Sequence, residues 1–99
     1  MMLKGVKQTS KFKKDLKVYK NDKKIEKELE TLINLILTES EIPDKYDKHP
    51  LKGRYKGEWD YHIRPNLILI CHVEDSVLSL SRIGTHSKLG LTEDISSYL

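Results

Sequence analysis

The 99-residue sequence has a single cysteine and no long apolar run. Cys71 has no partner with which to form a disulfide or a thiolate metal cluster, which agrees with a reducing compartment. No stretch approaches the roughly 18 apolar residues that would cross a bilayer, and the first residues lack the apolar run of a secretion signal. We therefore expect a cytoplasmic protein that does not associate with membranes.

The composition is that of one small globular domain. A chain of 99 residues does not divide into two cores that each bury enough surface to be stable. Hydrophobic residues make up 37% of the chain and charged residues 33%, which indicates a lean core under a richly charged surface rather than a disordered chain. The sequence contains no internal repeat and no linker.

Positive charge is concentrated near the N-terminus. The formal net charge is only +3, but the first 20 residues hold seven lysines and a single acid, Asp15. Such a patch suits a polyanion such as nucleic acid, because binding releases counterions. The same lysines could equally keep a helix soluble. Charge alone therefore leaves both interpretations open.

Two helices are predicted in the N-terminal half, after a first strand at residues 2–8. Thr9 or Ser10 can cap the first helix, and Asp22 can cap the second. The apolar residues that recur at helical spacing are Phe12, Leu16 and Tyr19 in the first helix and Ile25, Leu29, Leu32, Ile33, Ile36 and Leu37 in the second. These helices are expected to build the core and to take no part in chemistry.

From residue 58 onward, apolar and polar residues alternate with the period of a strand. The side chains expected on the packed face are Trp59, Tyr61 and Ile63, and those expected on the other face are Glu58, Asp60, His62 and Arg64. Turns at Pro65–Asn66 and Asp75–Ser76 would join three antiparallel strands. Their expected ranges are 58–64, 67–74 and 77–86.

Two-residue turns fix the expected register of these strands. His62 should lie opposite Leu69, and Trp59 should lie opposite His72. His72 would then share the helix-covered face with Trp59, where a hydrogen-bonded structural role is expected for it.

Arg82 is expected on the open face of the sheet, opposite residue 69. Uninterrupted pairing at this register would expose Leu78 and Leu80 to water. We therefore expect a bulge near Ser81, which would bury both leucines and leave Arg82 and His86 pointing outward.

The polar face of these strands could cleave RNA. His62 and His86 should emerge at the same end of the sheet, two strand spacings or roughly 10 Å apart, which leaves room for a phosphodiester. Cleavage through the 2′-hydroxyl of RNA requires a base, an acid and positive charge beside the phosphate. Histidine suits both proton roles because its usual pKa of about 6.5 allows one copy to be neutral and another charged near neutral pH. Asp60 would orient a histidine, and Arg82 would hold the phosphate.

Four motifs follow one another along the chain: His49-Pro-Leu-Lys-Gly53, Trp59-Asp-Tyr-His62, Arg64-Pro-Asn66-Leu-Ile-Leu-Ile70 and Arg82-Ile-Gly-Thr-His86-Ser. In this order they resemble the YafQ-type toxins of the RelE/ParE superfamily. The resemblance implies an α+β domain with the order β-α-α-β-β-β, in which two N-terminal helices pack on a twisted, mainly antiparallel sheet. It assigns residues 1–90 to this domain and leaves residues 91–99 as a tail, in which Thr92 could cap a short helix.

The resemblance also implies a function. Toxins of this type are ribosome-dependent mRNA endonucleases that enter the A site, and their mechanism requires no metal and no cofactor. An antitoxin of the RelB or DinJ type is expected as the partner, forming a hetero-oligomer with a toxin that is monomeric alone.

The matched positions define an expected site. Its catalytic residues are His49, Asp60, His62 and His86, with His86 the strongest candidate for direct proton transfer. Its substrate contacts are Arg82, Asn66, Lys52 and Arg54. The family commonly has an acid after the turn proline, whereas Asn66 can hydrogen-bond but carries no charge. The aromatic residue that often follows the last histidine is also missing, so base stacking would come from Tyr55 or from Trp59, although Trp59 is expected in the core.

Two other interpretations stay open. Asn66 supports a catalytically weak protein that keeps the fold and acts as an antitoxin partner or a ParE-like inhibitor, although such an inhibitor has no need of three histidines at one site. Asp60 and His62 could instead bind a divalent ion, but the sequence shows no closed set of ligands of the kind that zinc requires.

Overall fold

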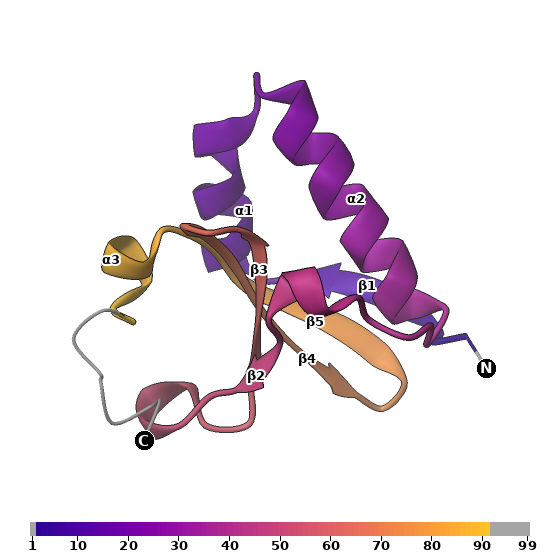
Figure 1. The fold of residues 1–99 in the computed structure, drawn as a ribbon. Coiled ribbons are helices and arrows are strands. Elements are labelled where there is room, and N and C mark those ends of the chain that lie inside the picture. Colours follow the sequence, from indigo (N-terminus) through magenta and orange to yellow (C-terminus); the bar gives the residue numbers. More distant parts are fainter. Residues whose placement is uncertain (1, 92–99) are drawn as a thin grey trace.

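The computed structural model describes residues 2–91 (Figure 1). In chain order the elements are β1 (Gly5–Gln8), α1 (Ser10–Leu16), the 3-10 helix η1 (Lys17–Tyr19), α2 (Lys23–Leu37), the 3-10 helix η2 (Asp44–Tyr46), β2 (His49–Pro50), the 3-10 helix η3 (Gly53–Tyr55), β3 (Trp59–Arg64), β4 (Leu67–Glu74), β5 (Val77–Gly84) and α3 (His86–Leu89). None of the helices in residues 2–91 has the length and apolar character needed to span a membrane. The predicted helix cap at Thr92 lies outside the described residues.

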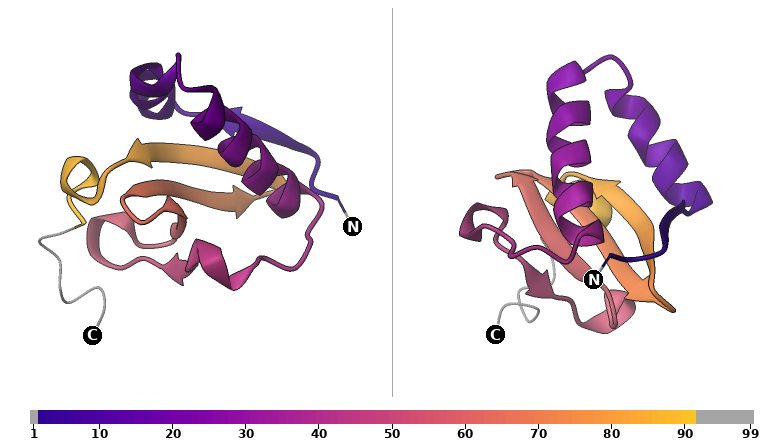
Figure 2. Two further views of the ribbon diagram at one scale, coloured as in Figure 1. Left: turned by 45° about the horizontal axis from the view of Figure 1, so that its top comes forward. Right: turned by 90° about the vertical axis from the view of Figure 1, so that its right-hand side faces the viewer.

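The strands form one five-stranded sheet in the order β1-β5-β4-β3-β2. β1 runs parallel to β5, and the other three pairs are antiparallel. Helices α1 and α2 lie on the same face of this sheet (Figures 1 and 2). The predicted α+β class, with two N-terminal helices on a mainly antiparallel sheet, is confirmed, and the two-residue β2 adds a strand that the sequence did not reveal.

Both helices begin at the predicted caps. The Thr9 hydroxyl accepts a hydrogen bond from the Phe12 N–H at 3.0 Å, and the Asp22 carboxylate accepts one from the Ile25 N–H at 3.1 Å. Each bond satisfies a backbone donor that has no partner inside its helix. Thr9 also donates to the Ser81 carbonyl at 2.9 Å, so it ties the start of α1 to β5.

The main core fills the space between the helices and the sheet. Its buried members include Phe12, Ile25, Leu29, Leu32 and Ile36 from the helices and Tyr61, Ile63, Leu67, Leu69, Cys71, Leu78, Leu80 and Ile83 from the strands. A smaller apolar cluster lies on the opposite face of the sheet, formed by Leu51, Ile68, Ile70, Leu89 and Leu91 with Tyr55 packed against it. The face of the sheet away from the helices was expected to be open, but this smaller cluster covers its middle.

The predicted register between β3 and β4 is wrong by one residue. The two-residue turn is present, because Arg64 pairs with Leu67. A bulge between His62 and Arg64 leaves Ile63 as an extra residue, so His62 pairs with Ile68 instead of residue 69. The same bulge turns Arg64 toward the helices.

This shift moves His72 to the face away from the helices, which corrects its predicted position. Trp59 pairs with Cys71, and a one-residue change of register reverses the face of every side chain. His72 Nδ1 is hydrogen-bonded to the Glu58 carboxylate, so its expected hydrogen-bonded character is confirmed. Trp59 is not a core residue: it is the first residue of β3, is 39% exposed, and has the Lys48 ammonium 4.5 Å from its ring centroid.

The bulge predicted near Ser81 is present. Arg82 pairs with Ile70, one residue away from its expected partner, and Leu80 pairs with the residue that follows Ile70. Ser81 is the extra residue between them. Leu78 and Leu80 are both buried as the prediction required.

Candidate active site

His49 and Asp60 face each other across the short β2–β3 pair. Asp60 is fully buried, and its Oδ1 accepts a hydrogen bond from the His49 N–H at 3.1 Å and lies 3.6 Å from His49 Nδ1. Burial raises the pKa of Asp60, and the neighbouring His62 and His49 act against this rise. When it is ionised, the buried carboxylate stabilises positive charge on the imidazoles beside it.

His62 occupies the middle of a three-histidine cluster. Its ring centroid lies 6.2 Å from that of His49 and 5.4 Å from that of His86. His62 Nδ1 and Asp60 Oδ2 are buried and have no hydrogen-bond partner within residues 2–91. Unpaired buried polar atoms are costly, so these two atoms mark a place where a water molecule or a substrate can supply the missing hydrogen bonds.

His86 lies closer to His62 than the predicted 10 Å because the last strand is shorter than expected. β5 ends at Gly84, and Thr85 caps α3, of which His86 is the first residue. The predicted strand through His86 is therefore wrong. The turn into α3 directs the imidazole back over the end of β3.

Asn66 fixes the orientation of the His86 ring. The Asn66 Oδ1 accepts the backbone N–H of His86 at 3.0 Å and lies 2.7 Å from His86 Nδ1. Because this oxygen is an acceptor, Nδ1 carries a hydrogen and donates it. In neutral His86 the lone pair is therefore on Nε2, as a general base requires. Asn66 thus reproduces the geometry expected of the missing acid but adds no charge.

A cleft of about 660 Å³ opens beside the histidines. Its lining residues are Glu28, Lys45, Tyr46, Asp47, His62, Ile63, Arg64, Pro65 and His86. Arg64 is bound to Glu28 at 2.7 Å. The volume is in the range of small-molecule sites, so the cleft has room for a nucleotide.

The expected phosphate contact, Arg82, is bound by an acid and does not line the cleft beside the histidines. Its Nε and Nη2 donate to the Asp15 carboxylate at 2.7 and 3.1 Å, and the Ile83 N–H donates to the same carboxylate at 3.1 Å. Burial alone would raise the pKa of Asp15, but the hydrogen bonds from Arg82 and Ile83 and the charge of Arg82 outweigh it and hold the pKa below its usual value. Arg82 shares a cross-strand row with Asp60, two strands away with Ile70 between them.

Two more predicted substrate contacts, Arg54 and Lys52, do not line that cleft either. Arg54 Nη2 and the Tyr55 hydroxyl both donate to the Leu89 carbonyl, at 2.7 and 2.8 Å. Lys52 is exposed just before η3. Of the eight residues predicted for the site, the structure thus brings together His49, Asp60, His62, Asn66 and His86.

Asp47 is a member of the cluster that sequence reasoning missed. Asp47, His49 and His62 each offer one ligand atom, and these atoms lie within 4.8 Å of one another. Imidazole and carboxylate together suit zinc, copper or nickel. Asp47 has a positive φ of 44°, a conformation that aspartate tolerates better than most residues, and the sequence gives little signal for it.

This fold is that of the small bacterial toxins of the RelE/YoeB-like class. More narrowly, the chain belongs to the YafQ family, since the family described as "Bacterial toxin of type II toxin-antitoxin system, YafQ" matches residues 4–91.

Individual relatives agree with this assignment. The chain is similar to the mRNA interferase toxin YafQ of Escherichia coli K12, at 32% identity over 90 residues, which covers 90% of this chain and 98% of the relative. The crystal structure of the E. coli DinJ–YafQ toxin–antitoxin complex matches with a TM-score of 0.75 at 33% identity, covering 85% of this chain and 93% of that chain. The metal-bound toxin from Helicobacter pylori matches with a TM-score of 0.75 at 34% identity, covering 89% and 99%.

Proposed function

We propose that the protein is a ribosome-dependent endoribonuclease that cleaves mRNA by acid–base attack of the RNA 2′-hydroxyl, and that a DinJ-like antitoxin neutralises it. The observation that carries this proposal is the convergence of three imidazoles from β2, β3 and α3, with ring centroids 6.2 and 5.4 Å apart, beside a buried carboxylate. The similarity to an E. coli protein named mRNA interferase, and to another crystallised with DinJ, supports the same conclusion.

We infer that the proton transfers are divided between two histidines. His86, with Nδ1–H held by Asn66, presents Nε2 to accept the 2′-hydroxyl proton. The 2′ oxygen then attacks phosphorus, and the bond to the 5′ oxygen breaks. His62, in its charged form beside Asp60, donates a proton to that departing oxygen, leaving a 2′,3′-cyclic phosphate and a 5′-hydroxyl. Acid–base catalysis of this kind accounts for roughly 10² to 10⁴ in rate.

The test is cleavage of a translated message in a reconstituted translation system. We expect the wild-type protein to cut the message within translated codons, and His86→Ala to lower the cleavage rate by roughly 10² or more. His72→Gln is the matched control, because His72 lies away from the cluster and is bound to Glu58. Equal rates for wild type and His86→Ala would refute the assignment.

The main alternative is a catalytically weak protein that acts through its partners. Asn66 favours it, because the amide holds His86 without the negative charge with which a carboxylate would stabilise a charged ring. A wild-type protein that binds its antitoxin tightly but leaves translated messages intact would establish this alternative.

A second candidate function is metal binding at Asp47, His49 and His62, which the similarity to a metal-bound H. pylori toxin favours. A bound ion would hold both imidazoles as neutral ligands and so remove them from proton transfer. We expect Zn²⁺ or Cu²⁺ to bind in calorimetric titration and to inhibit cleavage, and Asp47→Asn to weaken both effects. Cleavage that disappears in EDTA, with the magnesium of the ribosomes restored, would instead make the metal a requirement.

A further inference from the structure

A second polar cleft, of about 410 Å³, lies at the β5–α1 side of the sheet. Its lining residues are Thr9, Lys11, Arg54, Tyr55, Ser81 and Arg82. Among the residues that the structure describes, this lining includes three cations and no acid. Two acids contact this lining from behind: Asp15 binds Arg82, and Glu58 accepts from the Ser81 hydroxyl at 2.6 Å. Asp15 balances the charge of Arg82, whereas Lys11 and Arg54 contribute positive charge for which the lining holds no acid.

Both guanidinium groups of the cleft are held in place. Arg82 is fixed by two hydrogen bonds to Asp15, whose side chain is buried. Arg54 donates to the Leu89 carbonyl, and its guanidinium lies 5.0 Å from the centroid of the Tyr55 ring. Cations that are ordered before binding lose little entropy on it, and the planar guanidinium matches the geometry of a phosphate.

Gly90, the residue after α3, has no side chain, and this allows Arg54 to approach closely. Gly90 has a φ of +74°, and a Cβ at this position would come within 2.0 Å of Arg54 Nη2. Any other residue would be strained and would displace the guanidinium. Leu89 and Tyr55 thus contact Arg54, and Gly90 leaves room for its guanidinium.

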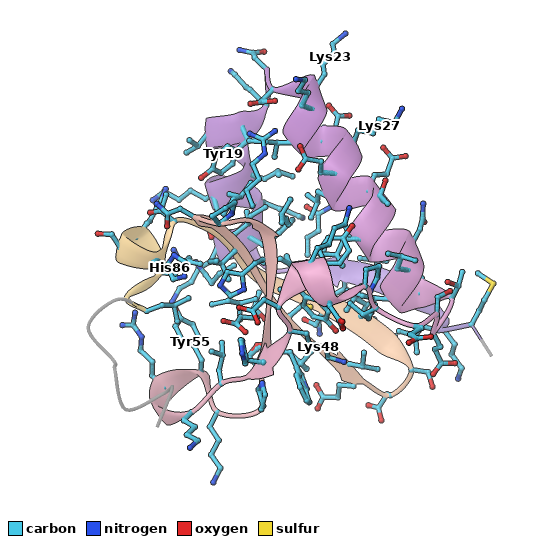
Figure 3. The ribbon with its side chains drawn as sticks, in the orientation of Figure 1. Tyr19, Lys23, Lys27, Lys48, Tyr55 and His86 are labelled. Atoms are coloured by element: carbon cyan, nitrogen blue, oxygen red, sulfur yellow. The ribbon has the colours of Figure 1, made fainter. Side chains whose placement is uncertain are left out.

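The cleft lies within reach of the histidine cluster. Leu89, which accepts hydrogen bonds from Arg54 and Tyr55, ends the four-residue helix α3, which begins with His86 (Tyr55 and His86 are labelled in Figure 3). That helix rises only about 1.5 Å per residue. Across the sheet, Arg82 lies two strand spacings, or roughly 10 Å, from Asp60. Stacked nucleotides repeat about every 3.4 Å along a strand, so a few nucleotides span this separation.

We propose that Lys11, Arg54 and Arg82 form a second phosphate subsite, which binds the backbone of the substrate RNA a few nucleotides from the linkage at the histidines. This proposal rests on the proposed function, and it assigns Arg82 and Arg54 to an outlying phosphate instead of the scissile one. Asp15 is a positioning residue that holds Arg82. Tyr55 supports Arg54 and offers the cleft an aromatic face against which a base can stack.

The experiment measures binding of a short single-stranded oligoribonucleotide, with every 2′-hydroxyl methylated to prevent cleavage, to the antitoxin-free full chain over a range of salt concentrations. Lys11→Gln and Arg54→Gln should each weaken binding several-fold and reduce the slope of log affinity against log salt by about 0.7, the value for one phosphate contact to a single strand. Lys13→Gln is the matched control, because Lys13 lies on the same helix but lines the groove between α1 and α2. It should weaken binding far less.

Lys11→Gln keeps the test valid if Arg54→Gln disturbs α3, since Lys11 is exposed and outside the core. On ribosomes, Lys11→Gln should raise the substrate concentration for half-maximal cleavage and leave the maximal rate unchanged. If the salt slope of both variants equals that of the wild type, the proposal is wrong. It is also wrong if they weaken only the antitoxin complex, which would make the cleft a protein-docking site, or only binding to ribosomes without mRNA, which would make ribosomal RNA the ligand.

The outcome is independent of catalysis. His86→Ala should bind the methylated oligonucleotide with the wild-type slope. A wild-type protein that binds it through Lys11 but cuts no message would leave the subsite standing and refute the proposed function alone.

Discussion

Asp15 is the residue through which α1 is attached to β5, and its removal should be costly. The Asp15 side chain is 5% exposed and that of Arg82 is 21% exposed. Removing one partner of such a pair leaves the other charge and the Ile83 N–H without their acceptor, which costs about 3–5 kcal/mol for a buried pair. Because water reaches Arg82 in part, we expect Asp15→Ala to lie near the lower value, about 3 kcal/mol. A domain of this size has only about 5–15 kcal/mol in total.

Urea unfolding followed by circular dichroism measures this effect. Asp15→Asn is the matched control: it keeps an acceptor for Ile83 and loses only the charge, so its destabilisation should be smaller. The folded-state pKa of Asp15 is lowered, so its contribution is complete at neutral pH and declines as the pH falls below about 3.9, the usual aspartate value, toward the folded one. The difference between wild type and Asp15→Asn should therefore shrink in acid. A loss below about 1 kcal/mol for Asp15→Ala would contradict the reasoning.

Three further predictions follow from buried groups. Burial raises the pKa of Asp60, so the stability that this residue contributes is present below about pH 3.9 and is lost as the pH rises through its folded pKa. Asp60→Asn should therefore keep or increase the stability measured in urea at neutral pH, while lowering the cleavage rate about tenfold or more. A large loss of stability would contradict this. Leu32 is 0% exposed in the main core, so Leu32→Ala should lower the free energy of unfolding by about 2–5 kcal/mol. A loss under about 1 kcal/mol would show that the neighbouring side chains move in to fill the cavity. Burial raises the pKa of Cys71 to about 12, so iodoacetamide should label it only after unfolding, and labelling of the native protein would show that β4 opens.

Local signals predicted the helices and one irregularity of the sheet. Thr9 and Asp22 were recognised as caps because their side chains act on backbone groups three residues away. The bulge at Ser81 was predictable because continuous pairing would have exposed Leu78 and Leu80, a conflict visible in the sequence.

The second bulge, at Ile63, could not be predicted in this way. Alternation through β3 is undisturbed in the sequence, so no exposed apolar residue revealed the extra residue. Because this bulge was not foreseen, the predicted register was wrong by one residue, and His72 was placed on the wrong face of the sheet. Thr85, by contrast, was an overlooked signal: it caps α3 through the Lys88 N–H, and recognising it would have ended the last strand before His86.

The sequence predicted the histidines of the candidate site but not the ion pair between Asp15 and Arg82. His49, Asp60, His62 and His86 were found from alternation and from motif order, and they lie together. The bond between Asp15 and Arg82 joins residues 67 apart in the chain, a distance over which no local pattern operates. Asp15 did leave one trace: it follows Phe12 by three residues, on the buried side of a helix otherwise rich in lysine.

The central claim is that the histidines act on the 2′-hydroxyl of one ribonucleotide linkage, and the most direct measurement replaces that hydroxyl alone. A message carrying a single 2′-deoxynucleotide on the 5′ side of the bond that the protein normally cuts is translated with the protein present, and the fragments are mapped. The account predicts that cleavage at this bond disappears while neighbouring sites are still cut. Cleavage at the deoxynucleotide at the normal rate would contradict it.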